Sequence, residues 1–301
     1  MAAAFASIRS NGRLMDRLPR VSMVMPVFNG ARYLATALDS ILAQDFQDFE
    51  LICLNDGSTD VTSRILADYA AKDSRIVYRD NPGNIGLPAT LNAGFALARG
   101  EYHSWTSHDN LLRPDMLSIL VEVLDADTSV GVAYAGYSVI DGDGQLLRYH
   151  PPRPPEERWF SNPVGAAFLY RRDVTKVLGG YDESLFGAED YDFWLRAARR
   201  FKLQPIDRDL YQYRRHDASL TSQKSGQIKD LVARVILREL DDVPDGKLRA
   251  KAILNLVLTD NAKFRARLVG KAFAASPTMA MTKLPALGYH LARIASSPLR
   301  A

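Results

Sequence analysis

Short apolar runs alternate with amphipathic stretches through the first third of the chain. The runs predict buried strands and the stretches predict helices, in strict alternation: strands at 21–26, 49–54, 75–79 and 101–107, and helices at 31–44, 58–71 and 88–99. Leu34, Leu38 and Ile41, for example, recur at the spacing of one helix face. Because single helices separate the strands, the pattern predicts an α/β fold with a mostly parallel, Rossmann-like central sheet and flanking helices.

The pattern is less regular after residue 113 and becomes helix-rich after about residue 223. It predicts helices at 114–124 and 188–200, strands at 130–140 and 204–216, a hairpin turn at DGDG (141–144) and a proline-rich surface loop at 150–157. We therefore expect three regions: a leader at 1–20, an α/β domain at 21–222 and a helical C-terminal extension at 223–301.

Composition places the chain among ordinary globular proteins, since 47% of its 301 residues are hydrophobic and 24% are charged. Cys53 is the only cysteine, so no internal disulfide is expected. The sequence contains neither a membrane-spanning apolar stretch nor a signal-peptide core. These features exclude disordered, disulfide-stapled and membrane-spanning classes and favour a cytoplasmic location.

Charge is distributed unevenly along the chain. The leader at 1–20 has four basic residues and one acidic residue, and 261–301 has seven basic residues and no acidic one. The whole chain has 38 basic and 35 acidic residues, of which 27 basic and 34 acidic residues lie in 21–260. The body of the protein is therefore acidic, which argues against nucleic-acid binding. The basic tail predicts weak attachment to an anionic membrane surface, with a solvated tail or a helix packed on the body as equal alternatives.

Polar segments follow three of the predicted strands, where a parallel sheet binds its ligands. They are PVFN (26–29), NDGSTD (55–60) and SHDN (107–110). The Asp56 carboxylate is suited to accept a hydrogen bond from a nucleobase, and Asp109 is suited to hold a divalent cation on a diphosphate. The alternatives are a helix start for NDGSTD, in which Ser58 and Asp60 are ordinary N-cap residues, and a polar turn for SHDN.

A third acidic segment, GAEDYDFW (187–194), opens the helix predicted at 188–200. Its acids either compensate the helix dipole or include a general base. Tyr191 and Trp194 either wall a pocket for a second substrate or belong to the core. His216 ends the strand predicted at 204–216, within reach of an ion or phosphate.

Taken together, these segments resemble one family. VSMVMPVFNGARYLATALDSILAQDFQDFELICLNDGSTD resembles the opening of the family 2 glycosyltransferases, inverting enzymes with the GT-A fold. The resemblance continues through NPGNIGLPATLNAGFALARGEY, WTSHDN, GGYDE, GAEDYDFWLRA and YRRHDASLT, so it runs from about Val21 to Thr221.

The resemblance implies roles for individual residues. Nucleotide-sugar binding falls in 21–112, on Pro26, Val27, Phe28, Asn29, Asp56, Asn84, Gly86, His108 and Asp109. Acceptor binding falls in 113–222, on Tyr191 and Trp194. Asp190, with Glu189 beside it, matches the catalytic base, and Asp109 with His216 matches the site of a divalent cation, Mn²⁺ or Mg²⁺.

The chain departs from the family pattern at several positions. Asn55 and Ser107 stand where many members have acids, Leu91 stands where many have arginine, and no Q-x-x-R-W segment of processive synthases is present. The resemblance implies a non-processive hexosyltransferase that moves a sugar from a UDP-linked donor to a hydroxyl of a glycan or lipid-linked acceptor, as in bacterial cell-surface polysaccharide or lipopolysaccharide assembly. The alternatives are a non-catalytic nucleotide-sugar-binding module with a degenerate metal site and, last, a sugar-nucleotide nucleotidyltransferase.

Overall fold

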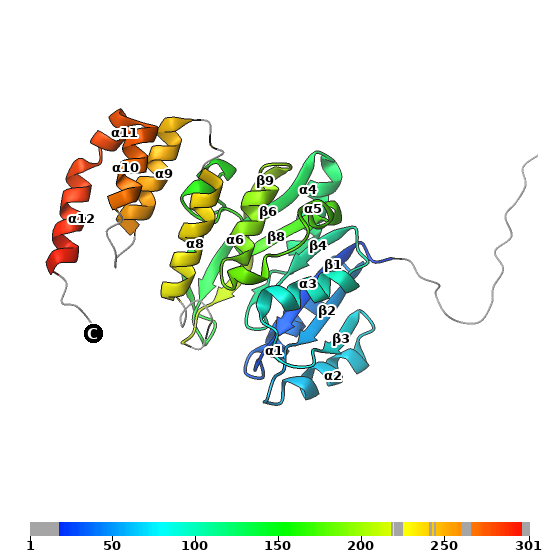
Figure 1. Ribbon diagram of the computed structural model, residues 1–301. Helices are drawn as coiled ribbons and strands as arrows, with labels where there is room; N and C mark the ends of the chain where they lie inside the picture. The colour runs from blue at the N-terminus through cyan, green and yellow to red at the C-terminus, as the bar shows by residue number, and fades with distance from the viewer. Residues whose placement is uncertain are drawn as a thin grey trace, which may run out of the picture.

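A computed structural model describes residues 18–217, 219, 225–240, 243, 245–259 and 266–296 of the protein. Its centre is a nine-stranded sheet with the strand order β3-β2-β1-β4-β8-β6-β9-β5, and β7 pairs with β6 (Figure 1). The strands are β1 Val21–Val27, β2 Phe49–Asn55, β3 Ile76–Asp80, β4 Tyr102–Trp105, β5 Leu111–Leu112, β6 Val130–Ile140, β7 Leu146–His150, β8 Ala167–Arg171 and β9 Lys202–Arg214. Residues 1–17 of the leader predicted at 1–20 lie outside the described residues.

The first four strands pair in parallel, and this confirms the βαβ organisation that the apolar pattern predicts. The rest of the sheet is mixed, because β8 runs antiparallel to β4 and β6, β7 to β6, and β5 to β9, while β6 and β9 are parallel. The hairpin predicted at DGDG joins β6 and β7, with Gly144 at φ 87° in the turn. The fold is thus α/β with flanking helices, as expected.

Helices cover both faces of the sheet and continue beyond it. They are α1 Leu34–Leu42, α2 Thr62–Lys72, α3 Leu87–Leu97, α4 Met116–Ala126, α5 Arg172–Leu178, α6 Glu189–Ala197, α8 Ser225–Leu240, α9 Gly246–Thr259, α10 Ala266–Ala275, α11 Pro277–Met281 and α12 Leu284–Ser296, with short 3₁₀ helices at Pro155–Trp159 and Glu183–Leu185. One apolar core lies between the sheet and α1, α2 and α4, and another between the sheet and α3, α5 and α6. These two cores make a three-layered body.

The C-terminal helices form a third core with α6. Tyr191 and Leu195 of α6 pack in one apolar cluster with buried residues of α8 to α12, so α6 belongs both to the body and to the extension. Figure 1 shows α8 beside α6, with α9 to α12 beyond it. In the described parts of the chain, no helix combines the length and the apolar character that a membrane span needs.

The structure contains elements in the second half that the sequence pattern does not predict. The proline-rich loop predicted at 150–157 contains a 3₁₀ helix, Pro155–Trp159, because proline is compatible with a first helical turn, where its missing N–H is not required. Residues 150–157 lie at the surface as predicted, whereas Trp159, the last residue of this turn, is buried in the core that includes the C-terminal helices. The pattern also missed β8 and α5, since the short run at 167–178 has no periodicity long enough to identify either element.

Candidate active site

The loop after β1 lies at the carboxyl edge of the sheet. Pro26 and Val27 are buried at the end of the strand, whereas the side chain of Phe28 is 46% exposed. Asn29 has φ 49°, a left-handed conformation that asparagine tolerates better than most residues, and its N–H donates to Ser58 Oγ at 2.9 Å. The loops after β1 and β2 are therefore joined, and they expose one aromatic ring beside their polar edge.

Asp56, directly after β2, organises the next loop along the chain. Its carboxylate is 4% exposed and accepts hydrogen bonds from Asn81 Nδ2 at 2.9 Å, Ile85 N–H at 2.9 Å and Gly86 N–H at 3.0 Å. Asn84, exposed on the same loop, also accepts from the Gly86 N–H, at 3.1 Å. The predicted nucleotide ligands Asp56, Asn84 and Gly86 thus lie together, and Asp56 also holds this loop in place.

A histidine and a carboxylate from distant parts of the chain meet after β4. His216 Nε2 lies 2.9 Å from Asp109 Oδ2, and the two side chains are 15% and 13% exposed. Arg214 aligns the two segments, since its N–H donates to Asn110 Oδ1 at 2.8 Å and its Nε to the Asp109 carbonyl at 2.9 Å. Burial lowers the pKa of the adjacent His108. The structure thus brings Asp109 and His216 together, as predicted.

This pair fits a divalent cation that is held mainly by its substrate. Within the described residues, no group of three or more His, Cys, Asp and Glu side chains converges as a metal site. A cation such as Mg²⁺ or Mn²⁺ on a diphosphate needs only one or two protein ligands, because phosphate oxygens and water complete its shell. Asp109 supplies an oxygen donor and His216 a nitrogen donor at one place, so the donor set is compatible with such an ion.

Two adjacent acids begin α6. Asp190 accepts from Asn162 Nδ2 at 2.9 Å and from the Tyr191 N–H at 2.6 Å, and the buried Glu189 accepts from the Gly187 N–H. Burial raises the pKa of both carboxyl groups, and the charge of Asp190 raises that of Glu189 further. The raised pKa of Asp190 suits proton transfer near neutral pH.

The aromatic residues of α6 do not line a pocket. Trp194 is 1% exposed and packs edge-on against Phe168 and Tyr170 in the core beneath the sheet. Tyr191 is 3% exposed and donates its hydroxyl hydrogen bond to the carbonyl of Arg158. Both rings are core residues, and their prediction as an acceptor wall is not supported, because α6 turns that face toward the sheet and the C-terminal helices.

A small cavity of about 30 Å³ lies next to the acids instead. It is lined by Ala135, Tyr137, His150, Pro151, Pro152, Arg153, Asn162, Pro163 and Val164. Asn162 links this cavity to the hydrogen bond with Asp190, and the rings of Tyr137 and His150 stack at 5.0 Å. Sequence reasoning missed these residues, since nothing in the local sequence of Asn162 indicates its partner 28 positions away.

The sequence model of the family described as Glycosyl transferase family 2 matches residues 22–179, more than half of the chain. The chain belongs to glycosyl transferase family 2. A relative in this family, an uncharacterized glycosyltransferase of Rickettsia typhi, is 32% identical over 229 residues, which cover 71% of this chain and 70% of that protein.

Solved structures give the fold class of this glycosyltransferase. Residues 1–349 of TarS from S. aureus, in complex with UDP-GlcNAc, align with a TM-score of 0.69 and 20% identity over 91% of this chain and 88% of that one. A mannosyltransferase from Pyrobaculum calidifontis, in complex with GDP-Man and Mn²⁺, aligns with a TM-score of 0.64 and 19% identity over 92% of this chain and 80% of that one. The fold is of the GT-A type, and the protein is a transferase of sugars.

Proposed function

We propose that the protein is an inverting, non-processive hexosyltransferase that moves a sugar from a UDP-linked donor to a hydroxyl of a glycan or lipid-linked acceptor. The observation that carries this proposal is the Asp190 carboxylate at the start of α6. This carboxylate is partly buried and accepts a hydrogen bond from Asn162 Nδ2 at 2.9 Å, and burial raises its pKa. Such a carboxylate is suited to take a proton from a hydroxyl group.

The donor half is assigned to the loops after β1, β2 and β4. Asp56 and the Phe28–Asn29 turn would hold the nucleoside, and Asp109 with His216 would hold a divalent cation, Mn²⁺ or Mg²⁺, on the diphosphate. Such an ion would neutralise the charge that develops on the departing diphosphate. The UDP-GlcNAc complex of TarS supports a UDP-linked donor, and the Mn²⁺ complex of the mannosyltransferase supports the cation.

On the acceptor side, Asp190 would act as the general base. The acceptor hydroxyl loses its proton to Asp190 Oδ2 as its oxygen attacks the anomeric carbon from the side opposite the diphosphate, so the anomeric configuration inverts. General-base assistance of this kind contributes about 10²–10⁴-fold to a rate. Glu189 would stay protonated beside it, because burial and the negative charge of Asp190 both raise its pKa. In this arrangement the acceptor would approach from the side of the cavity beside Asn162.

The alternative of a non-catalytic nucleotide-sugar-binding module rests on Ser107, which replaces an acid in the metal-binding segment. The adjacent acids Glu189 and Asp190 favour the enzyme, because a binding module gains nothing from two neighbouring carboxyl groups whose pKa values are raised. We therefore keep the transferase as the proposal.

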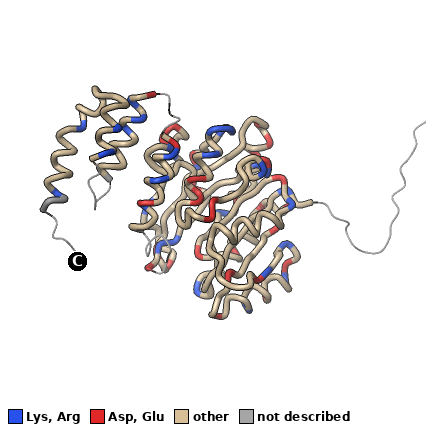
Figure 2. The backbone as a smooth tube through the Cα atoms, viewed as in Figure 1, with Lys and Arg blue, Asp and Glu red and all other residues tan. Residues whose placement is uncertain are grey.

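The proposed setting is bacterial cell-surface polysaccharide or lipopolysaccharide assembly at the cytoplasmic face of a membrane. Its support is the C-terminal region, where residues 266–296 include Arg267, Lys271, Lys283 and Arg293 but no acidic residue (Figure 2). Leu284, Tyr289 and Leu291 of α12 are 48%, 74% and 41% exposed. Exposed apolar side chains among basic ones are suited to weak attachment at an anionic lipid surface.

Two substitutions test the division of labour between donor and acceptor sides. Asp190→Asn keeps the shape of the side chain and removes the base, so transfer should fall at least tenfold while calorimetric affinity for UDP stays near wild type. Asp109→Asn should abolish the Mn²⁺-dependent part of that affinity. Transfer above about a tenth of the wild-type rate in Asp190→Asn would exclude this residue as the base.

A further inference from the structure

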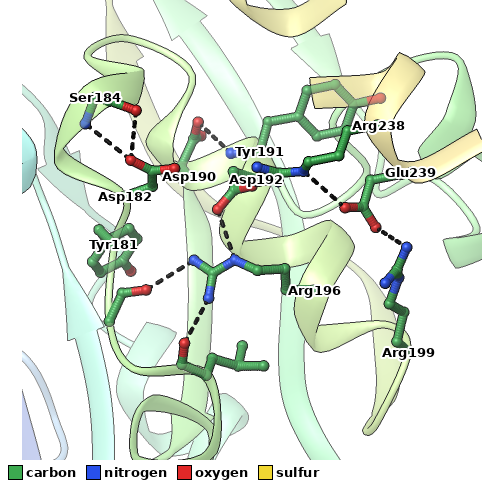
Figure 3. Close-up of polar contacts among 12 residues, drawn as sticks. Tyr181, Asp182, Ser184, Asp190, Tyr191, Asp192, Arg196, Arg199, Arg238 and Glu239 are labelled. Carbon is green, nitrogen blue, oxygen red and sulfur yellow. Dashed lines mark hydrogen bonds and ion pairs between the residues drawn. The ribbon is translucent and has the colours of Figure 1, made fainter. Parts of the chain in front are cut away.

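The first turn of α6 carries another buried acid, which points away from Asp190. Asp192 lies two residues further on, and at about 100° per residue the two side chains leave the helix on nearly opposite sides. The Asp192 side chain is 1% exposed and accepts from Arg196 Nε at 2.7 Å and from Arg238 Nη2 of α8 (Figure 3). One face of this turn therefore presents Asp190, and the opposite face is bound to the C-terminal extension.

The contact with α8 is an extended ion-pair network, shown in Figure 3. Arg238 also donates from Nε to Glu239 Oε1 at 3.2 Å, and Glu239 Oε2 lies 2.7 Å from Arg199 Nη2, just beyond the end of α6. The Glu239 side chain is 4% exposed. Because buried carboxylates are costly without cationic partners, this network holds α8 and α6 in one relative position.

Apolar contact with α8 reaches the turn that precedes the two acids. Gly187 has φ 93°, and a Cβ on this residue would lie 2.7 Å from Ile228 Cγ1 of α8. The backbone of this turn thus packs directly on α8, and only glycine fits there. Ile228 thus lies against the chain just before Glu189 and Asp190, and Arg238 contacts Asp192 just after them.

The body itself also holds the side of α6 that carries Asp192. Arg196 donates from Nη1 to the Leu178 carbonyl at 2.9 Å and from Nη2 to the Gly180 carbonyl at 2.8 Å. Asp192 is therefore shared between an arginine of its own helix and an arginine of the extension. The extension thus supplies one of the two arginine partners of Asp192.

We propose that Arg238 and Ile228 of α8 are positioning residues for Asp190, so that the C-terminal extension completes the active site. They touch neither substrate nor cation. They fix the orientation of the first turn of α6 and its position relative to α8. This keeps the Asp190 carboxylate where it accepts the hydrogen bond from Asn162. This inference rests on the proposed role of Asp190 as the base.

The test compares Arg238→Ala with Arg234→Ala, an exposed arginine on the same helix, and with Arg238→Lys. UDP release from UDP-GlcNAc in the presence of Mn²⁺ gives kcat and the donor KM. For Arg238→Ala we expect a kcat about 10- to 100-fold lower, since small misplacements of a catalytic group have effects of this size, and an unchanged donor KM. Arg234→Ala should match wild type, and Arg238→Lys should recover part of kcat.

A second readout needs no substrate. The carboxyl group of Asp190 is titrated by ¹³C NMR; the titratable groups that interact with it electrostatically are Glu189, Tyr137, Tyr181 and Tyr191. Because burial raises the pKa of Asp190, a displaced first turn should lower it toward its ordinary value. We expect this shift in Arg238→Ala and not in Arg234→Ala. If Arg238→Ala does not fold, Ile228→Ala serves as the second variant. It removes no charge, and we expect it to shift the pKa of Asp190 in the same direction.

An unchanged pKa of Asp190 in the folded Arg238→Ala variant would overturn the inference, as would a wild-type kcat or equal losses in Arg234→Ala. A donor KM that rises in step with the fall in kcat would also overturn it, because it would indicate general loosening. Asp190→Asn separates the two proposals. If that variant retains transfer, the base assignment itself fails; if it is inactive while Arg238→Ala is normal, only the positioning role fails.

Discussion

Replacing Asp56 by alanine should affect both nucleotide affinity and stability. The carboxylate is 4% exposed and accepts three hydrogen bonds, from Asn81 Nδ2 and from the N–H groups of Ile85 and Gly86. Asp56→Ala removes the only group that gathers these three donors. The loop between β3 and α3 should therefore lose its fixed conformation together with the direct contact to the nucleoside.

The size of each effect follows from the same contacts. A hydrogen bond to a charged group contributes about 1.5–3 kcal/mol. Ile85 is 46% exposed, so part of this loop regains water when the carboxylate is lost, and we expect the free energy of unfolding to fall by about 2–4 kcal/mol rather than by the full sum. Loss of one direct contact should weaken UDP binding by about 1–3 kcal/mol, or roughly 5- to 150-fold in Kd.

Urea denaturation gives the stability, and calorimetry with UDP gives the affinity. Asp68→Ala is the matched control, because Asp68 is an exposed residue of α2 whose side chain lies 3.9 Å from Arg64. Its stability should change by less than about 0.5 kcal/mol. Unchanged affinity in a folded Asp56→Ala variant would refute the nucleotide role, and unchanged stability would refute the loop role.

Three further outcomes are expected. Asn162→Ala removes a hydrogen bond that lowers the pKa of Asp190, so the acid limb of the kcat–pH profile should move to higher pH; an unmoved limb would contradict the contact. Burial lowers the pKa of His103 from 6.5 to about 4, so the unfolded chain binds the proton more readily, and stability should fall by roughly 3 kcal/mol as the pH drops from 6.5 to 4. His103→Phe should flatten that decline, as urea denaturation across this range would measure. Reversing the charges of Lys283 and Arg293 should reduce cosedimentation with anionic liposomes, and equal pelleting would exclude attachment through this region.

The loops of the candidate site could be predicted because each follows an apolar run in a recognisable segment. PVFN, NDGSTD and SHDN come after β1, β2 and β4, three neighbouring parallel strands whose carboxyl ends lie at one edge of the sheet. The identity of these residues and the strands predicted from the apolar runs were enough to place Asp56 and Asp109 at this edge of the sheet. The proposed acceptor side was harder to predict, because β8 and α5 are short. In addition, the spacing of the aromatic residues of α6 is the same whether they line a pocket or belong to the core.

The sequence by itself determined the family, the βαβ order of the first half and the residue types at the carboxyl edge, because these depend on local periodicity and contiguous motifs. The family resemblance also placed Asp109 and His216 at one site, and the structure brings them together across 107 positions. Only the tertiary structure decided that Asp190 meets Asn162 across 28 positions and that Asp192 meets Arg238 across 46. It also assigned Trp194 to the core. The physical reason is that hydrogen bonds and burial depend on distances in space, and chain folding brings together groups whose sequence positions carry no record of one another.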